Sequence, residues 1–126
     1  MAVGAGVTLG SLTSCASFPV YTTSVRKKEI AVPLSLFVDQ NIRIIRAKEL
    51  GYDIALRKEN DGQYTALLLR CTHASNSLTY TGSEFRCPLH GSRFDEEGGV
   101  TRGPATTSLS KLATKISDEA IVIGVE

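Results

Sequence analysis

The sequence of 126 residues contains no tryptophan, one methionine and only two histidines, and aromatic residues make up 6% of it. No apolar run approaches the roughly 18 to 20 residues that a membrane-spanning helix needs. The formal net charge is +1, so bulk charge gives no reason to expect nucleic acid as a partner. The apolar content of 42% is ordinary for a soluble protein, and the length suits one domain with its own core.

The scarce histidines both lie beside cysteines, in the stretch that runs from Arg70 to Asp95. One pair is Cys71-x-His73 and the other is Cys87-Pro88-Leu89-His90, with thirteen residues between them. Thiolate and imidazole are common metal ligands in proteins. The gathering of both histidines beside two of the three cysteines therefore predicts a metal site.

Three other interpretations fit this stretch less well. A zinc site of two Cys and two His usually places Cys with Cys and His with His, whereas here the two types alternate. A disulfide between Cys71 and Cys87 would make the histidines incidental. A hydrolase that used Cys71, His73 and Asp95 would leave the spacing of the two pairs unexplained.

The two pairs resemble the cluster-binding loops of the Rieske family. The family's loops read Cys-Thr-His and Cys-Pro-x-His-Gly-Ser, and this chain has Cys71-Thr72-His73 and Cys87-Pro88-Leu89-His90-Gly91-Ser92. A third family loop, Gly-Pro-Ala, matches Gly103-Pro104-Ala105. The resemblance implies one 2Fe–2S cluster in each chain.

By matching position, the resemblance assigns a role to five residues. Cys71 and Cys87 would hold the inner iron, and His73 and His90 would hold the outer, solvent-facing iron. Ser92 would donate a hydrogen bond to the cluster, most simply to a bridging sulfide. Two ferric ions, two sulfides and two thiolates sum to zero charge, and a neutral cluster accepts an electron more readily than one with four thiolates.

The chain departs from the high-potential members of the family in two ways. Those members carry a second Cys in each loop, and the two form a disulfide, but here the positions are Asn76 and Leu89. They also carry a Tyr that donates a hydrogen bond to a cysteine sulfur, and here Phe94 has no donor. A lost donor lowers the potential, so we expect a value in the lower or middle part of the roughly −150 to +300 mV Rieske range. The missing disulfide also makes the loops resemble those of Rieske ferredoxins and oxygenase-associated domains.

Short β-branched segments separated by turn signals predict an all-β fold. The resemblance implies an antiparallel β-sandwich or barrel base with an inserted cluster-binding subdomain from about Leu69 to Asp95. We expect residues 1–24 to form a leader and linker and residues 25–126 to form the Rieske domain, with no convincing helix. The segments expected to be strands are Ile30–Leu34, Ile42–Arg46, Tyr52–Leu56, Tyr64–Leu69, Ser83–Arg86, Lys111–Ile116 and Ala120–Val125.

The first residues resemble the end of a secretion signal. Leu12-Thr13-Ser14-Cys15 is similar to a bacterial lipobox, in which Cys15 would be lipidated and become the mature N-terminus. This predicts a lipid-anchored protein of the bacterial cell envelope that faces the periplasm. The alternative is an N-terminal tail with a free thiol, in a cytoplasmic protein.

Three functions are consistent with these residues. The first is a one-electron transfer protein or subunit that docks a redox partner near His73 and His90. The second is an envelope-anchored Rieske subunit of a respiratory quinol-oxidising complex. The third is a non-redox metal-binding interaction module. No histidine is left for the mononuclear iron of an oxygenase, so we expect an electron-transfer component and not a stand-alone catalyst.

Overall fold

The computed structural model describes residues 19–125, and its elements are almost entirely β-strands, which confirms the all-β prediction. The chain order of the elements is β2 (Val20–Thr23), β3 (Glu29–Pro33), the 3-10 helix η2 (Leu34–Phe37), β4 (Ile42–Ala47), β5 (Ile54–Lys58), β6 (Tyr64–Leu68), β7 (Thr79–Tyr80), β8 (Glu84–Arg86), β9 (Arg93–Asp95), β10 (Val100–Arg102), β11 (Lys111–Leu112), β12 (Thr114–Ser117) and β13 (Ala120–Gly124).

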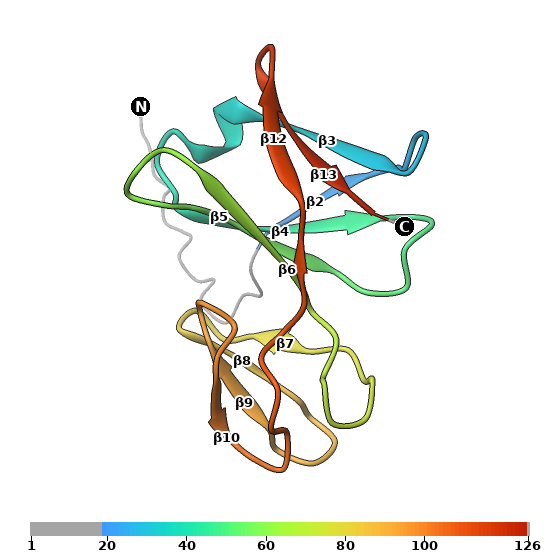
Figure 1. Cartoon of the computed structure of the whole chain (residues 1–126), viewed down its shortest axis with the longest axis vertical. Helices are drawn as coiled ribbons and strands as arrows, with labels where there is room; N and C mark the ends of the chain where they lie inside the picture. The colour runs from blue at the N-terminus through green and yellow to red at the C-terminus, as the bar shows by residue number, and fades with distance from the viewer. Residues whose placement is uncertain (1–18, 126) are drawn as a thin grey trace, which may run out of the picture.

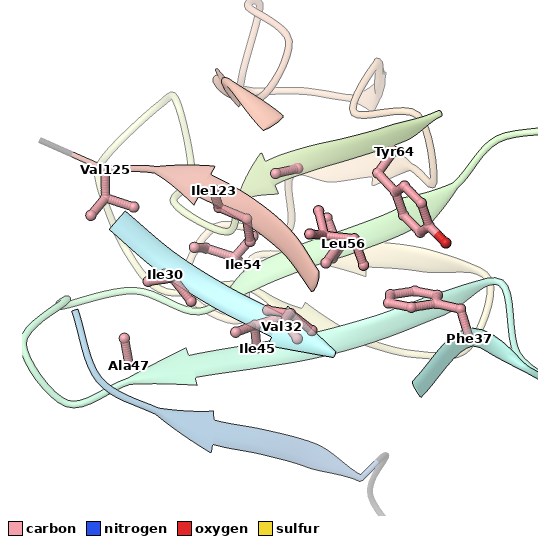
Figure 2. Close-up of a cluster of buried hydrophobic side chains, with 12 residues drawn as sticks. Ile30, Val32, Phe37, Ile45, Ala47, Ile54, Leu56, Tyr64, Ile123 and Val125 are labelled. Carbon is pink, nitrogen blue, oxygen red and sulfur yellow. The ribbon is translucent and has the colours of Figure 1, made fainter. Parts of the chain in front are cut away.

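Two sheets form the base of the molecule (Figure 1). One has the strand order β11-β6-β5-β4-β2 and the other has the order β12-β13-β3. Figure 2 shows the apolar side chains of both sheets pointing toward one another, among them Ile30 of β3, Ile123 of β13 and Leu56 of β5. These three side chains are fully buried, so this core closes without any contribution from a metal site.

The central strands of the larger sheet are buried on both faces. Successive side chains of a strand point to opposite sides, so Ile45 of β4 enters the core of the base while its neighbour Ile44 enters a second core. Ala55 of β5 and Leu67 of β6 join Ile44 in that second core. The larger sheet thus packs against the smaller sheet with one face and against the second core, which includes Cys71 and Cys87, with the other.

Residues 69–110, which we call the cluster subdomain, leave the larger sheet after β6 and return to it at β11, where Lys111 pairs with Leu67. The cluster subdomain contains the sheet β10-β9-β8-β7, which lies at one end of the molecule, below the base in Figure 1. Phe85 of β8 and Phe94 of β9 pair across this sheet and are fully buried. The inserted subdomain implied by the resemblance is therefore present, and it extends to residue 110, beyond the expected end at Asp95, because β10 joins its sheet.

The region expected to be a linker contains strand β2, and this part of the prediction was wrong. Residues 20–23 pair with residues 44–47 of β4 in parallel, whereas every other strand pair in residues 19–125 is antiparallel. The strand expected over Ile30–Leu34 ends at Pro33, and η2 follows, with Phe37 buried against Tyr64 at a ring-centroid distance of 5.1 Å. In residues 19–125, no helix is long and apolar enough to cross a membrane.

One ion-pair network joins the base to the cluster subdomain. The guanidinium group of Arg57 on β5 lies 2.9 Å from a carboxylate oxygen of Glu59. It also lies 3.6 Å from a carboxylate oxygen of Glu97, in the turn between β9 and β10. The hydrogen bonds from Arg57 are the main reason that the pKa of Glu59 lies below its usual value.

Candidate metal centre

The first loop of the site follows β6. The carbonyl of Cys71 accepts a hydrogen bond from the backbone N–H of Ser75 at 2.7 Å, and the N–H of Cys71 donates to the carbonyl of Asn76 at 2.8 Å. The residues between them form a turn. The turn wraps the backbone around the cysteine side chain.

The second loop, between β8 and β9, repeats this hydrogen-bond pattern. The carbonyl of Cys87 accepts from the N–H of Gly91 at 3.0 Å, and the N–H of Cys87 donates to the carbonyl of Ser92 at 2.8 Å. Gly91 has φ +83° and the matching Ser75 has φ +60°, so both loops use a left-handed residue at the same point. The two cysteine loops are equivalent in backbone structure although their Cys–His spacings differ.

The two cysteines lie at the bottom of these loops and share one apolar cluster. Cys71 is 1% exposed and Cys87 is 0% exposed, and the structure leaves both as free thiols. Burial by itself raises the pKa of the Cys71 thiol. Hydrogen bonds from the backbone of His73 and Ala74, together with contacts to Cys87 and Ser92, outweigh burial and lower that pKa. The surroundings therefore stabilise the Cys71 thiolate, the form that binds metal, relative to that of an ordinary cysteine.

Both histidines lie on the solvent side of the cysteines. His73 and His90 are exposed, and their ring centroids are 5.3 Å apart with the ring planes at 81°. The structure therefore brings together all four predicted ligand residues, as a buried sulfur pair and an exposed imidazole pair.

Ser92 is fully buried, which is rare for a polar side chain with no role in the site. Its hydroxyl oxygen accepts a hydrogen bond from the N–H of Ala105 at 3.0 Å, which ties the third loop to the second. The hydroxyl proton then remains for a sulfur acceptor, and Cys71 is the thiol that Ser92 contacts. The sequence predicted that Ser92 donates to a bridging sulfide of the cluster, and this bond stays a prediction.

Two hydrogen bonds that the sequence did not indicate hold the first loop in place. The hydroxyl of Tyr52 donates to the carbonyl of Ser75 at 2.8 Å, and the guanidinium of Arg70 lies 5.9 Å from the Tyr52 ring centroid. The hydroxyl of Thr72 donates to the carbonyl of Thr107 at 2.6 Å. Neither contact has a local signal in the sequence, because the partners are 23 and 35 residues apart.

The donor set fits a two-iron cluster better than a single zinc ion. In residues 19–125, no three side chains of His, Cys, Asp or Glu converge in the way that one tetrahedral ion requires. A 2Fe–2S cluster instead takes two ligands at each of two irons, so its thiolates and imidazoles need not meet at one point. The separation into a buried pair and an exposed pair matches that requirement.

A comparison with protein families decides between these interpretations. The model of the Rieske [2Fe-2S] domain matches residues 31–114. The chain belongs to the Rieske family. This membership indicates a 2Fe–2S cluster as the cofactor, while the start of the Rieske domain at residue 25 stays a prediction.

Sequence relatives include iron-sulfur subunits of the cytochrome b6-f complex. The cytochrome b6-f complex iron-sulfur subunit of Nostoc punctiforme is 46% identical over 55 residues, which are 42% of this chain and 31% of that protein. Subunit 2 of the same complex in Nostoc sp. is 31% identical over 72 residues, which are 56% of this chain and 40% of that protein. The matches thus span less than half of these curated relatives.

Solved structures share the fold. The plasma membrane Rieske protein PetC3 of Synechocystis has a TM-score of 0.61 and 24% identity, over 76% of this chain and 99% of that one. A structure of oxygenase and ferredoxin in carbazole 1,9a-dioxygenase has a TM-score of 0.55 and 23% identity, over 80% of this chain and 96% of that one. Both confirm a Rieske-type architecture.

Proposed function

We propose that this protein transfers single electrons through a 2Fe–2S cluster, with Cys71 and Cys87 on the inner iron and His73 and His90 on the outer iron. The observation that carries the proposal is the pairing of two buried, unbridged thiols with two exposed, adjacent imidazoles. When bound, the cluster supplies a site that gains or loses one electron at a time. The buried thiols keep it anchored, and the imidazoles offer the shortest route to a partner.

The residues around the cluster would set the ease of its reduction. Backbone amides of His73 and Ala74 and the hydroxyl of Ser92 face the Cys71 sulfur, and such donors stabilise the extra negative charge of a reduced cluster. Phe94 is fully buried and offers no further donor. Leu89, at one of the positions that would carry the bracing disulfide, is 62% exposed. The lack of a donor at Phe94 and of a bracing disulfide at Leu89 supports a potential in the lower or middle part of the Rieske range.

The exposed imidazoles could also couple electrons to protons. Each ring would use one nitrogen for iron, and the other nitrogen could still carry a proton. Bound ferric iron would favour loss of that proton, because a cation stabilises the deprotonated ring. Reduction at alkaline pH would then take up a proton at His73 or His90, which are both in contact with solvent.

The redox partner would dock at the tip that His73 and His90 form. Leu89 adjoins His90 and is one of the large apolar side chains of residues 19–125 that are mostly exposed. A small apolar and uncharged contact suits the brief encounters of electron-transfer proteins.

A second candidate is an envelope-anchored Rieske subunit of a quinol-oxidising complex. The cytochrome b6-f subunits and the plasma membrane protein among the relatives favour it. The lipobox-like Cys15 would supply the anchor, but it lies outside the described residues. Intact-mass analysis of protein from bacterial membranes tests this placement: a diacylglyceryl group on Cys15 supports the anchor, and an unmodified thiol in the soluble fraction contradicts it.

A redox titration of the anaerobically purified protein tests the main proposal. The expected result is a one-electron transition of a 2Fe–2S cluster in the lower or middle part of the range from roughly −150 to +300 mV, with a pH-dependent potential at alkaline pH. A potential at the top of the range would favour the quinol-oxidising candidate. A colourless zinc protein would instead support the non-redox interaction module.

A further inference from the structure

The three loops of the site differ in charge from the residues that border them. Residues 71–77, 87–92 and 103–108 contain no Asp, Glu, Lys or Arg. Arginine stands at the border of each loop, as Arg70, Arg86, Arg93 and Arg102. We call these four residues the arginine collar.

Three members of the arginine collar lie side by side in the sheet of the cluster subdomain. Arg86 of β8 pairs with Arg93 of β9, and a β-bulge in β10 brings Arg102 opposite the same Arg93. Because neighbouring strands are about 4.8 Å apart, the three backbone positions fall within roughly 10 Å of one another. The paired Phe85 and Phe94 point into the core, so Arg86 and Arg93 point outward, at the end of the hairpin that carries the His90 loop.

This row of arginines is poorly neutralised by the residues that the structure describes. A single carboxylate, that of Glu84, lies 3.5 Å from the Arg86 guanidinium and 3.8 Å from that of Arg93. Arg102 makes no ion pair with any residue that the structure describes. The nearby Asp95 instead accepts hydrogen bonds from the backbone of Glu97 and Gly99. Like charges opposite one another weaken a sheet, so folding does not explain the row.

We propose that the arginine collar docks an acidic redox protein, whose carboxylates meet the arginines that border the uncharged loops while its cofactor faces His73 and His90. This inference rests on the proposed electron-transfer function and specifies the partner. An uncharged centre with a charged rim is the usual arrangement of a protein interface. Because the net charge of the chain is only +1, the positive potential is local to this face and would orient an acidic partner as it approaches.

A partner protein fits this face better than a membrane. An anionic bilayer that bound the arginine collar would cover the two exposed imidazoles, which are the atoms nearest to the outer iron in the proposed ligand set. An acidic protein that binds there brings its own electron carrier to the imidazoles. The position of the charges around the redox tip therefore favours the protein.

Binding of poly-L-glutamate tests the arginine collar without any redox reaction. The variant R86Q/R93Q/R102Q removes the row, and R26Q/K27Q/K28Q makes the same change in net charge in the turn between β2 and β3. At about 10 mM salt, we expect the collar variant to lose roughly tenfold in affinity and the control variant less than twofold. Equal losses would overturn the proposal, because net charge alone would then account for binding.

Stopped-flow oxidation of the reduced protein tests the same surface at the redox tip. One electron passes from the reduced cluster to hexacyanoferrate(III) or to tris(phenanthroline)cobalt(III), giving hexacyanoferrate(II) or the cobalt(II) complex. The collar variant should react roughly fivefold more slowly with the anion and faster with the cation at low salt, and the differences should vanish at high salt. Unchanged rates for both reagents would overturn the proposal.

Two further results distinguish a failure of the electron-transfer function from a failure of the acidic partner. If the purified chain lacks iron and sulfide, the proposed function fails, while poly-L-glutamate binding still decides whether the arginine collar attracts acidic chains. Collar-dependent binding to phosphatidylglycerol vesicles without binding to poly-L-glutamate would overturn the protein partner in favour of a membrane surface.

Discussion

The base and the cluster subdomain are held together by different means. In the base, β13 pairs with β3 over five residues and β5 pairs with β6 over five. In the cluster subdomain, β7 pairs with β8 over two residues and β8 with β9 over three. The core of the base is apolar except for the hydroxyl group of Tyr64. The second core includes Cys71 and Cys87 and lies beside the buried Ser92.

This difference indicates which region the cofactor helps to fold. Apolar burial alone can stabilise the base, because its core is continuous between two sheets. The strands of the cluster subdomain pair over fewer residues, so the bonds from two loops to one cluster should supply part of its stability. We expect the base to fold without iron and the cluster subdomain to gain much of its order from the cluster.

Replacing a proposed inner ligand should separate the two regions most strongly. We expect Cys87→Ser to abolish the 2Fe–2S cluster, since a neutral hydroxyl does not replace a thiolate on iron. Hydrogen exchange should then show lost protection across residues 69–110 and retained protection in β3, β5 and β13. Cys15→Ser is the matched control and should keep full iron content. Uniform loss of protection in Cys87→Ser would contradict the independence of the base.

Matched truncations in the two cores compare the stability of the base with that of the cluster subdomain. Ile123→Ala removes a fully buried side chain from the base and should cost about 2–5 kcal/mol of global stability, with iron per folded molecule unchanged. Phe85→Ala removes a fully buried side chain beside the cysteines and should cost a similar amount of stability, about 3–5 kcal/mol. We expect this destabilisation to show mainly as a faster release of iron from the cluster. Thermal unfolding and iron-release rates, measured on both variants, distinguish the outcomes. Identical behaviour of the two variants would mean that the cores unfold as one unit.

Removing the Ser92 hydroxyl should change the cluster without changing the base. A hydrogen bond to a charged group contributes about 1.5–3 kcal/mol, and the part gained on reduction raises the potential, so Ser92→Ala should lower the potential by up to roughly 130 mV for one electron. The exposed Ser108 provides the control, and Ser108→Ala should leave the potential unchanged. Protein-film voltammetry measures both. An unchanged potential in Ser92→Ala would show that its hydroxyl serves only the N–H of Ala105.

The smallest effect concerns the ion pairs that join the two regions. Arg57 lowers the pKa of Glu59, so this pair contributes stability above the unfolded pKa of Glu59, and the contribution disappears as the pH falls through the lowered folded value. Arg57→Gln should cost about 0.5 kcal/mol at neutral pH, because both side chains are partly exposed. Urea unfolding at pH 7 and at pH 2.5 measures the difference between variant and parent. A cost that persists at pH 2.5 would indicate lost packing and not lost charge pairing.

Local patterns in the sequence predicted much of this structure. The turn between β5 and β6 is marked by Asp61-Gly62, and Gly62 has φ +85° as such a turn requires. The four proposed ligands were evident because Cys71, His73, Cys87 and His90 stand in two short motifs. The resemblance implied that these residues lie close together. The structure places the two cysteines in one buried cluster and the two histidine rings with their centroids 5.3 Å apart.

Features that depend on distant residues could not be predicted in this way. Strand β2 forms only because the edge of β4 is free to pair with it in parallel, and nothing within residues 20–23 specifies that partner. The equivalence of the two cysteine loops was hidden by their unequal Cys–His spacing. The equivalence depends on left-handed backbone at Ser75 and Gly91. Serine rarely adopts this conformation, so its presence at position 75 does not predict it.

The most direct test of the account uses the fact that the chain contains only two histidines. Protein made without a histidine tag and labelled with 15N-histidine would be reduced and studied by pulsed EPR. The account predicts a 2Fe–2S signal in which two 15N nuclei couple strongly to the cluster, one each from His73 and His90. A cluster with no strongly coupled nitrogen, or with only one, would contradict the proposed ligand set and with it the electron-transfer tip.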